Sequence, residues 1–488
     1  MHNEQVFTPS DIVGLMLSKI AYFSSNDDIL DKHFMDCSAG DGHIILPAMW
    51  AYAECAKRNG WSLTEIKQGL ETHFHAIEID PDLMEKLILN VNYLFPAWHL
   101  ELDFKVGDAT ELYKDYVGKM DYVVGNPPYC KIHDIAYSKR DEYKELARFN
   151  KDVKDKGTFD SYILFFKLGL DMLKDNQESV LCYITPNTWT TSLYGKEFRR
   201  ALLRREYSLL QVIDMQHTQV FPGVTTFTTI SVIGKGDRKK EKKTEIFKTH
   251  YDMPLSLSGF LGKDFLQAYT IGKNDSFFFQ SKKELETLNN INKTTYSYFT
   301  VKNGFATLND KLFVSDEQQT GPHWRPCRKI SKDKLQYIFF PYDVDGKPLG
   351  LQDFTDDECN WLFSKSKELY MDTSSKPNTW FLYGRTQAIK DANRKFVAVN
   401  NLFKTKDDVK LEFCDKKTVT YSAFYILSKG EYENPNEYEF IKETLKSDDF
   451  IKYVSLLARY KNGGYYTITS DEMEKYINFK WQTKEEEQ

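Results

Sequence analysis

The sequence predicts an α/β protein with a doubly wound, mainly parallel sheet in the first half, followed by a C-terminal mixed α+β domain. Short apolar runs such as Tyr122–Val124 alternate with amphipathic helical stretches over residues 1–236, a pattern typical of βαβ units. Several of these runs end at glycine or an acidic residue, at the edge where open α/β sheets bind ligands. Residues 264–488 lack this alternation, and the lysine-rich stretch 237–263 is predicted to be the linker.

The composition bounds the class of protein. A chain of 488 residues is long enough for two or three domains, and 41% hydrophobic residues indicate a globular protein. No apolar run has the length of a membrane span, so a cytoplasmic protein without a membrane partner is expected. The 7 cysteines include no CxxC pair, which indicates a reducing compartment and no zinc site. The net charge of −6 excludes a uniformly basic nucleic-acid binder, so DNA binding requires a local basic cleft.

A stiff Asn-Pro-Pro-Tyr turn ends the predicted strand Tyr122–Gly125. Pro127 and Pro128 lack the N–H groups that continue a sheet ladder, and they restrict the backbone around them. The side-chain oxygen of Asn126 and the carbonyl of Pro127 are two acceptors for both hydrogens of a planar –NH2 group, which returns the lone pair to nitrogen. Tyr129 can stack on the ring that carries the amine. The alternative is an ordinary strand-ending turn, because Asn-Pro is a common turn dipeptide.

Acidic residues follow three earlier predicted strands. Asp36 opens the loop DCSAGDG (residues 36–42), whose glycines let a backbone approach a ligand closely. Glu78 follows the second strand, where a carboxylate can bind both ribose hydroxyls. Asp108 follows the third strand, where a carboxylate can accept from an adenine amino group. Each acid alone is compatible with a surface loop, but their order, followed by Asn-Pro-Pro-Tyr, indicates a nucleoside site.

These motifs resemble, in the same order, those of the gamma-class (TaqI-like) N6-adenine DNA methyltransferases of type II restriction–modification systems. Phe-Thr-Pro at residues 7–9 resembles the N-terminal cofactor motif of that family, and DCSAGDG resembles its glycine loop, with Cys37 in place of the usual proline. AIEIDP (residues 76–81) and GDAT (107–110) resemble its ribose and adenine motifs. The resemblance implies a class I S-adenosylmethionine-dependent methyltransferase fold, S-adenosyl-L-methionine as cofactor, no metal, and extrusion of the target base from the duplex.

The resemblance also implies roles for individual residues. It gives catalysis to the turn and cofactor binding to the strand ends and the loops that follow them. The implied catalytic residues are Asn126, Pro127, Pro128 and Tyr129. The implied cofactor-binding residues are Phe7, Thr8, Pro9, Asp36, Ala39, Gly40, Gly42, Glu78, Ile79, Asp108 and Ala109.

Two further segments of the first half are candidates for the target-base side of the site. The resemblance implies that Phe221 stacks on the flipped adenine opposite Tyr129, and a core phenylalanine beside a Pro-Gly turn is the alternative. Residues 131–157 are charged and weakly periodic, and they are predicted to be a mobile insertion that closes over the site. A solvated surface loop explains the same composition.

In the second half, cationic and amide side chains lie among aromatic residues in WRPCRK (324–329) and YGRTQ (383–387). Arginine and glutamine suit the edges of guanine and adenine, and YGRTQ resembles a stretch in recognition domains of type II methyltransferases. Surface arginines of a mixed β domain are the alternative. The run Val301–Val314 predicts a β-hairpin from its Asn-Gly turn, and no nuclease motif is found. The DNA-binding candidates are Arg325, Arg328, Lys329, Arg385 and Gln387.

The sequence thus predicts a site-specific DNA methyltransferase that transfers a methyl group from S-adenosyl-L-methionine to N6 of a flipped adenine, as the modification enzyme of a restriction–modification system. Residues 1–236 are expected to be catalytic and residues 264–488 to be the target recognition domain. Expected partners are double-stranded DNA and a separately encoded cognate endonuclease, and a monomer is expected. Alternatives are an Asn-Pro-Pro-Tyr methyltransferase acting on RNA, protein glutamine or cytosine N4, or a recognition subunit without turnover.

Overall fold

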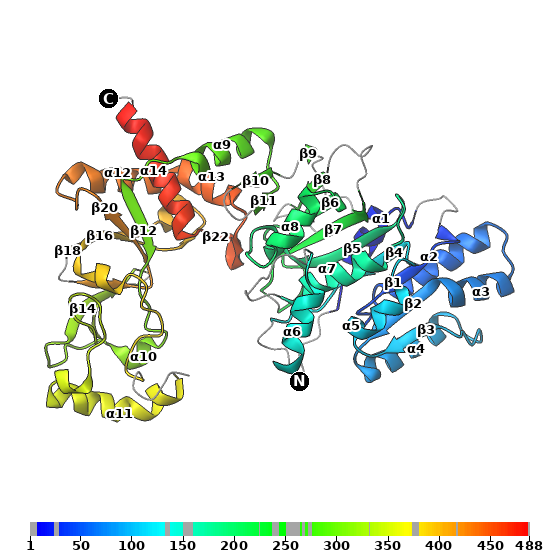
Figure 1. The fold of residues 1–488 in the computed structure, drawn as a ribbon, viewed down its shortest axis with the longest axis horizontal. Coiled ribbons are helices and arrows are strands. Elements are labelled where there is room, and N and C mark those ends of the chain that lie inside the picture. Colours follow the sequence, from blue (N-terminus) through cyan, green and yellow to red (C-terminus); the bar gives the residue numbers. More distant parts are fainter. Residues whose placement is uncertain are drawn as a thin grey trace. The chain divides into compact units, whose positions relative to one another are not determined.

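The structure is a computed structural model, shown in Figure 1. The chain divides into two compact units, Met1–Leu285 and Glu286–Gln488, which are described one at a time. Among the described residues, no helix is both long enough and apolar enough to cross a bilayer. The structure describes residues 7–23, 29–131, 137–149, 160–223, 225–236, 244–249, 264–265, 269–271, 276–330, 332–372, 380–415 and 418–486.

The first unit is built on a sheet with the strand order β3-β2-β1-β4-β5-β7-β6-β8-β9. β1 to β5 run parallel, and β7 lies antiparallel between β5 and β6. The predicted doubly wound, mainly parallel sheet is therefore confirmed. The strand order reverses between β1 and β4, which is the topological switch point where such sheets bind ligands. The strands are β1 Phe34–Asp36, β2 Phe74–Glu78, β3 Asp103–Val106, β4 Tyr122–Gly125, β5 Val180–Pro186, β6 Tyr207–Asp214, β7 Thr228–Lys235, β8 Glu245–Lys248 and β9 Asp264–Phe265.

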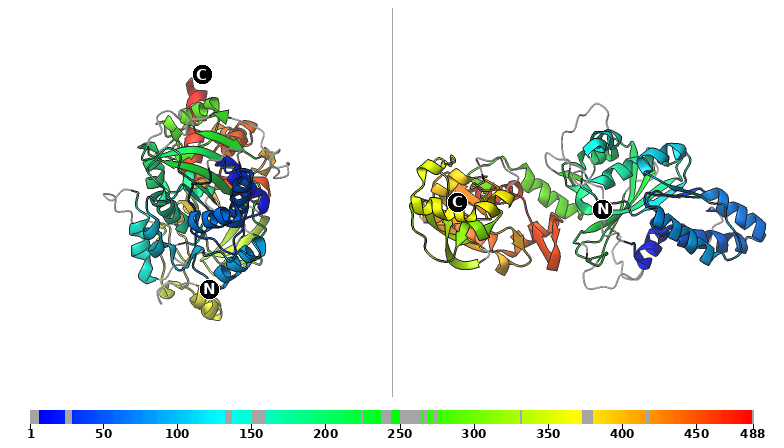
Figure 2. Two further views of the ribbon diagram at one scale, coloured as in Figure 1. Left: turned by 90° about the vertical axis from the view of Figure 1, so that its right-hand side faces the viewer. Right: turned by 90° about the horizontal axis from the view of Figure 1, so that it is seen from below.

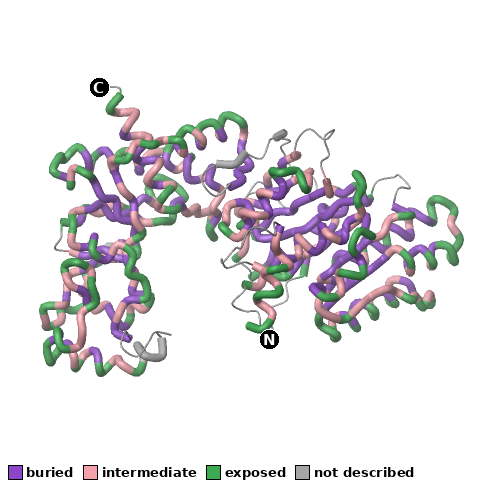
Figure 3. Tube along the Cα trace, in the orientation of Figure 1, coloured by how far each residue is buried: buried purple, intermediate pink, exposed green. Residues whose placement is uncertain are grey.

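Helices cover both faces of this sheet. Side chains of α1, α2 and α4 share one buried cluster with Cys182 and Ile184 of β5. The alternate residues Leu181 and Tyr183 point to the other face, where they contact Gly169 of α7 so closely that a Cβ there would collide with both. Buried residues accordingly run along the strands of this unit (Figure 3), and Figure 2 shows the ribbon of the same fold from two further sides. The helices are α1 Ser10–Lys19, α2 Ile45–Arg58, α3 Leu63–His73, α4 Pro81–Leu94, α5 Ala109–Leu112, α6 Tyr137–Leu146, α7 Ser161–Met172 and α8 Lys196–Leu203, with a short 3-10 helix at Tyr113–Tyr116.

Two predicted segments of the first unit differ from the structure. The predicted linker 237–263 contains β8, which joins the sheet because its buried Ile246 and Phe247 pair in parallel with β6. The boundary between the two units accordingly falls within helix α9 (Lys282–Lys293) rather than at residue 264. The predicted insertion 131–157 contains helix α6, while its residues 132–136 and 150–157 lie outside the described residues.

The second unit is mixed α+β, as predicted, with two four-stranded sheets and a three-stranded one. The predicted hairpin at 301–314 is wrong. β12 pairs with β20, more than a hundred residues away in sequence, because its buried Phe299 and Val301 complete that sheet, and a helical turn occupies Asp310–Phe313. The remaining elements are β10 Tyr269–Ile271 and β11 Ser276–Phe278 of the first unit, then β12 Phe299–Asn303, α10 Asp310–Phe313, β13 Val314–Ser315, β14 Trp324–Lys329, β15 Lys332–Phe339, α11 Asp356–Asp372, β16 Lys395–Val399, β17 Leu402–Phe403, β18 Leu411–Asp415, β19 Val419–Tyr421, β20 Phe424–Ser428, α12 Pro435–Leu445, α13 Asp448–Leu456, β21 Tyr460–Lys461, β22 Tyr465–Thr467 and α14 Ser470–Glu486.

Candidate active site

Four functional candidates lie in a row at the carboxyl edge of the sheet. Asp108 follows β3, Glu78 ends β2, Asp36 ends β1 and Asn126 follows β4. The strands are neighbours in the order β3, β2, β1, β4, with about 4.8 Å between adjacent strands. Along this edge the four residues therefore lie in the order Asp108, Glu78, Asp36 and Asn126, with the Asn-Pro-Pro-Tyr turn at one end.

The turn is held by its own tyrosine. The Tyr129 hydroxyl lies 2.6 Å from Oδ1 of Asn126 and 3.0 Å from the carbonyl oxygen of Ile184 on β5. Burial raises the pKa of Tyr129 above its ordinary value, so the hydroxyl remains a donor. The hydroxyl has a single proton, so it donates to one of these two oxygens at a time.

Asp36 is a buried carboxyl group beside the turn. Its side chain is 1% exposed, and Oδ1 accepts a hydrogen bond of 3.1 Å from the backbone N–H of Ser38. A Cβ atom on Gly125 would lie 3.2 Å from the same oxygen, so the glycine allows the turn to approach the carboxyl group. Burial, and to a smaller degree the charge of Glu78, raises the pKa of Asp36 to about 7. A cation bound here would stabilise the carboxylate form.

Glu78 joins the glycine loop to the loop after β2. Its two carboxylate oxygens accept from the backbone N–H groups of Gly40 at 2.7 Å and of Asp80 at 3.0 Å. Gly40 and Gly42 have φ angles of 55° and 102°, the left-handed region that favours glycine. At Gly42 a Cβ atom would also lie 2.8 Å from Leu46 Cδ1. The loop conformation therefore depends on these two glycines and on Glu78.

The N-terminal Phe-Thr-Pro segment lies against this glycine loop. The ring of Phe7 stacks on His43 with 4.8 Å between ring centroids, and Phe7 Cε1 is the atom nearest to a Cβ on Gly40, at 3.9 Å. Thr8 is buried, and Pro9 precedes the first residue of α1. Ile79, by contrast, is 67% exposed, which leaves an apolar face beside Glu78. The structure thus brings the predicted cofactor residues of three separate segments together.

Asp108 accepts four hydrogen bonds. Oδ1 accepts from the backbone N–H of Thr110 at 3.0 Å and from its hydroxyl at 2.8 Å. Oδ2 accepts from Nζ of Lys139 at 2.7 Å and from the hydroxyl of Tyr143 at 2.6 Å. Burial raises the pKa of Asp108, but these donors outweigh it and hold the pKa at about 2. Ala109 is buried beside it.

The contact of α6 with Asp108 was not predicted from the sequence. Lys139 and Tyr143 both lie on this helix, which belongs to the segment predicted to close over the site. The charged composition of residues 131–157 indicated an insertion, but no motif identified the two donors. The long-range pairing became visible only in the folded chain.

Phe221 does not present a stacking face in this structure. Its ring is 0% exposed and lies within the buried cluster of the sheet. The ring meets Tyr129 edge to face, with 6.4 Å between centroids and 62° between planes. The residue therefore lies beside the turn, as expected, but its stacking on a base stays a prediction because the core covers it.

Three of the predicted DNA-binding residues are engaged within the second unit. Arg325, Arg328 and Lys329 lie on β14, and each has a polar partner there. The pKa of Arg325 is lowered by burial, which indicates a structural position. The partners are Asn393 at 2.6 Å together with the ring of Phe340 for Arg325, Glu412 at 3.3 Å for Arg328, and Asp310 at 2.6 Å for Lys329.

Arg385 and Gln387 are placed differently. Both are exposed, and among the described residues neither side chain forms a hydrogen bond or ion pair. The backbone of Arg385 pairs with that of Ala306 through hydrogen bonds of 3.0 and 3.1 Å, which anchors the loop that carries both residues. Of the five candidates, these two have the geometry of side chains that can contact DNA.

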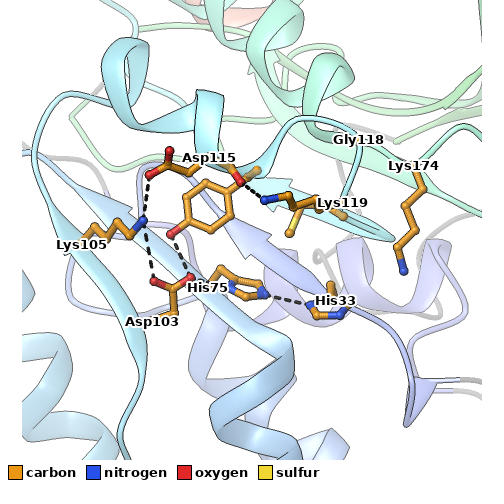
Figure 4. A pocket seen from close by; sticks show the side chains of 10 residues that line it. His33, His75, Asp103, Lys105, Asp115, Gly118, Lys119 and Lys174 are labelled. Atoms are coloured by element: carbon orange, nitrogen blue, oxygen red, sulfur yellow. Dashed lines mark hydrogen bonds and ion pairs between the residues drawn. The ribbon is translucent and has the colours of Figure 1, made fainter.

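A polar pocket lies at the opposite edge of the sheet (Figure 4). His33 Nδ1 lies 2.9 Å from His75 Nε2, and His75 Nδ1 lies 2.8 Å from Asp103, which also accepts from Tyr116 at 2.9 Å. The cavity of about 640 Å³ sits at the amino ends of β1 to β3, away from the Asn-Pro-Pro-Tyr turn. Burial and the neighbouring His75 lower the pKa of His33 to about 4. No sequence motif pointed to this pocket.

Within the part of the chain that is described, no group of three or more His, Cys, Asp or Glu side chains could hold a metal ion. All seven cysteines are free thiols.

Comparison with known proteins gives a consistent result. Residues 51–221 match the family described as Eco57I restriction-modification methylase. The type II methyltransferase M.BstVI of Geobacillus stearothermophilus is 23% identical over 430 residues, which cover 77% of this chain and 73% of that protein. M.XhoI of Xanthomonas vasicola, also a type II methyltransferase, is 27% identical over 49% of this chain and 43% of its own length. The type II restriction enzyme and methyltransferase RM.Eco57I of Escherichia coli is 24% identical over 46% of this chain and 21% of its length.

Two solved structures share the fold at low sequence identity. The type IIL restriction-modification enzyme MmeI in complex with DNA has a TM-score of 0.60 and 13% identity, covering 95% of this chain and 65% of that one. A nuclease-deletion mutant of the type ISP enzyme LlaGI with a DNA substrate mimic has a TM-score of 0.59 and 13% identity, covering 99% and 55%. This chain therefore spans 65% and 55% of the length of those two proteins. Residues 51–221 are therefore similar to the Eco57I restriction-modification methylase family, and the solved structures share the fold of the chain.

Proposed function

We propose that this protein is a site-specific DNA methyltransferase that transfers a methyl group from S-adenosyl-L-methionine to N6 of a flipped adenine, as the modification enzyme of a restriction–modification system. The observation that carries the proposal is the row Asp108, Glu78, Asp36 and Asn126 along the sheet edge. This order matches the parts that must be aligned for transfer: adenine, ribose, methionine and the acceptor amine.

The side chains present fit the cofactor. Asp108 accepts from the adenine amino group with the exposed Ile79 on the adenine face, and Glu78 binds the ribose. Asp36 faces the methionine part, whose ammonium favours the carboxylate form of a buried acid. When bound, S-adenosyl-L-methionine supplies a methyl group on a sulfonium, which is a good leaving group. Positioning of the acceptor amine is therefore the main task that remains for the protein.

The turn performs that positioning. Oδ1 of Asn126 and the carbonyl oxygen of Pro127 each accept one hydrogen of the adenine amine, which concentrates the lone pair on nitrogen. An amide oxygen has two lone pairs, so Oδ1 accepts from the base and from Tyr129 at once. The Tyr129 ring replaces part of the stacking that the base loses on leaving the duplex. Nitrogen gains the methyl group and loses one proton to water.

Duplex DNA is the substrate that the relatives favour. The names of several relatives describe type II methyltransferases, and two structures of similar fold were determined with DNA or a DNA mimic. Arg385 and Gln387 supply exposed base-reading groups on the second unit. A separate cognate endonuclease, a monomeric state and a reducing cytoplasm, which suits the free thiols, complete the proposal.

The function is tested by incubating the protein with plasmid DNA and methyl-labelled cofactor and then digesting the DNA to nucleosides. N6-methyldeoxyadenosine is the expected labelled product, and Asn126→Ala is expected to bind the cofactor normally while transfer falls below detection. Label in N4-methylcytosine would replace the adenine assignment. Label that appears only in added RNA or in a glutamine-containing peptide would favour the other Asn-Pro-Pro-Tyr chemistries.

A further inference from the structure

The Asn-Pro-Pro-Tyr turn cannot satisfy its own hydrogen bonds. Pro127 and Pro128 have no N–H group, and the conformation they impose prevents the regular ladder from continuing past β4. The carbonyl groups of Asn126, Pro127 and Pro128 and the N–H of Cys130 therefore need partners from elsewhere in the fold.

Ser161, the first residue of α7, is the partner of two of these groups. Its hydroxyl donates to the carbonyl oxygen of Pro128 and accepts from the backbone N–H of Cys130 at 2.9 Å. Its own backbone N–H donates to the carbonyl oxygen of Cys130 at 2.8 Å. A hydroxyl can donate and accept at the same time, so one small buried side chain bridges both sides of Tyr129.

The helix behind Ser161 is a rigid support. Most residues of α7 are buried, and its Gly169 lies directly against Leu181 and Tyr183 of β5. The next residue, Tyr162, is 0% exposed and meets the Tyr129 ring edge to face at 6.3 Å. Consecutive residues of α7 thus hold the backbone and the ring of the motif tyrosine.

The three carbonyl groups of the turn differ in their hydrogen-bond donors. Ser38 of the glycine loop donates to the carbonyl oxygen of Asn126 at 3.3 Å, and Ser161 donates to that of Pro128. Among the described residues, none donates a hydrogen bond to the carbonyl oxygen of Pro127, which lies between them. The middle carbonyl is the one that the proposed mechanism needs as an acceptor for the amine.

We infer that Ser161 is a positioning residue for methyl transfer, which holds Pro128 to Cys130 so that the Pro127 carbonyl and the Tyr129 ring face the acceptor base. The inference rests on the proposed function. On this inference Ser161 acts only through the turn, whose Pro128 and Cys130 it bonds. Its loss leaves the Cys130 N–H and the Pro128 carbonyl without their partner, so the turn shifts, and a displacement of about 1 Å at a reacting group can cost on the order of 100-fold in rate.

The experiment compares three variants at this position with a matched control, using the full chain and plasmid DNA that the wild-type protein methylates. Ser161→Ala removes the hydroxyl, Ser161→Cys fills the same space but hydrogen-bonds weakly, and Ser161→Thr restores a hydroxyl. The control is Ser179→Ala, which removes a buried hydroxyl bonded at 2.8 Å to Asn176 just before the amino end of β5. Each variant is measured for kcat, for KM of DNA, for cofactor affinity and for thermal stability.

The expected result is a fall in kcat of about 10- to 100-fold for Ser161→Ala and nearly as much for Ser161→Cys. KM and cofactor affinity should stay within about twofold, because Ser161 is inferred to act through the turn alone. Ser161→Thr should recover most of kcat, and Ser179→Ala should lose stability like Ser161→Ala but keep kcat.

Several outcomes overturn the inference. A wild-type kcat in Ser161→Ala, a loss explained by the unfolded fraction, or an equal loss in Ser179→Ala each shows that Ser161 has only a structural role. If Ser161→Thr folds normally but does not recover kcat, Ser161 likewise has only a structural role. If the wild-type protein methylates no DNA, the proposed function is wrong and the inference falls with it, whereas a methylating wild type with an unaffected Ser161→Ala refutes the inference alone.

Discussion

The hydroxyl of Tyr129 donates a hydrogen bond to Oδ1 of Asn126 across 2.6 Å. The bond joins two residues of the same turn: Tyr129, whose ring is proposed to stack on the target base, and Asn126, whose oxygen is proposed to accept a hydrogen bond from the amine. Tyr129 is therefore proposed to have two separable functions, one in its ring and one in its hydroxyl.

These functions predict different effects for two substitutions. Tyr129→Phe keeps the ring but removes one hydrogen bond to the Asn126 amide, and should lower single-turnover methyl transfer by about tenfold, the value of one lost hydrogen bond of about 1.4 kcal/mol. Tyr129→Ala also removes the stacking surface and should lower transfer further without an equal loss of duplex binding. Tyr22→Phe is the control, because the Tyr22 hydroxyl is buried without a hydrogen-bond partner among the described residues. Equal effects of the two Tyr129 variants would contradict the division of roles.

Asp36 predicts a pH dependence of cofactor binding. Its pKa is raised to about 7, so the free protein holds a proton there at pH 6, and a cationic ligand favours the deprotonated form. Cofactor affinity should therefore rise between pH 6 and 8, with proton release on binding at pH 6. Titration calorimetry in buffers of different ionisation enthalpy measures both quantities.

The variant Asp36→Asn tests whether Asp36, rather than another titrating group, causes the pH dependence of cofactor binding. It should bind S-adenosyl-L-methionine more weakly and without that pH dependence. Because the folded pKa lies above the unfolded one, Asp36 lowers stability as pH rises from 4 through 7, so Asp36→Asn should gain stability relative to wild type over that range. A variant whose cofactor affinity still follows the wild-type pH curve would exclude Asp36 as the source.

Asp108 predicts competition between α6 and the cofactor. Its two oxygens already accept four hydrogen bonds, about the capacity of a carboxylate, so an adenine amino group must displace one donor. Tyr143→Phe removes a competing donor from the free protein and should tighten cofactor binding by about three- to tenfold. Tyr137→Phe, which alters an 85% exposed ring on the same helix, is the control. Weaker binding by Tyr143→Phe would mean that this hydroxyl supports the bound state instead.

The pocket at the other edge of the sheet predicts a stability effect. The pKa of His33 is lowered to about 4, so the unfolded chain takes up a proton near pH 6.5 that the folded protein takes up only near pH 4. His33 therefore makes the protein less stable as pH falls from 6.5 to 4. Urea unfolding at several pH values gives the free energy of unfolding as a function of pH. Between pH 4 and 6.5 this free energy should change less with pH for His33→Gln than for wild type. The exposed His99 provides the control His99→Gln, and an unchanged slope in His33→Gln would refute the prediction.

Two arginines of the second unit are expected to have different roles, one in DNA binding and one in stability. Arg385 is exposed, so Arg385→Ala should weaken binding to methylatable duplex by about tenfold or more without a change in melting temperature. Arg325 donates to Asn393 and covers the Phe340 ring, so Arg325→Ala should lower the melting temperature. Fluorescence anisotropy at fixed salt and thermal unfolding distinguish the two. A reversed pattern would show that the exposed loop does not read DNA.

The sequence by itself determined the sheet and the row of polar groups on it. Apolar runs that end in Asp36, Glu78, Asp108 and Asn126 predict parallel strands, and parallel strands carry their ends to one edge whatever the rest of the chain does. The signal is local, because each strand and its terminal residue are adjacent in the chain. The same locality explains why the glycines of the first loop could be recognised.

The tertiary structure decided what surrounds that row. The partners Ser161 and Pro128 are 33 residues apart in the sequence, and Tyr143 and Asp108 are 35 apart. No local sequence pattern near these residues predicts either contact. Burial of Phe221 and the entry of β8 into the sheet likewise follow from which apolar surfaces meet, as does the pairing of β12 with β20 instead of a hairpin. Local pattern specifies an element and its end, whereas its neighbours are selected by the packing and hydrogen bonding of the whole unit.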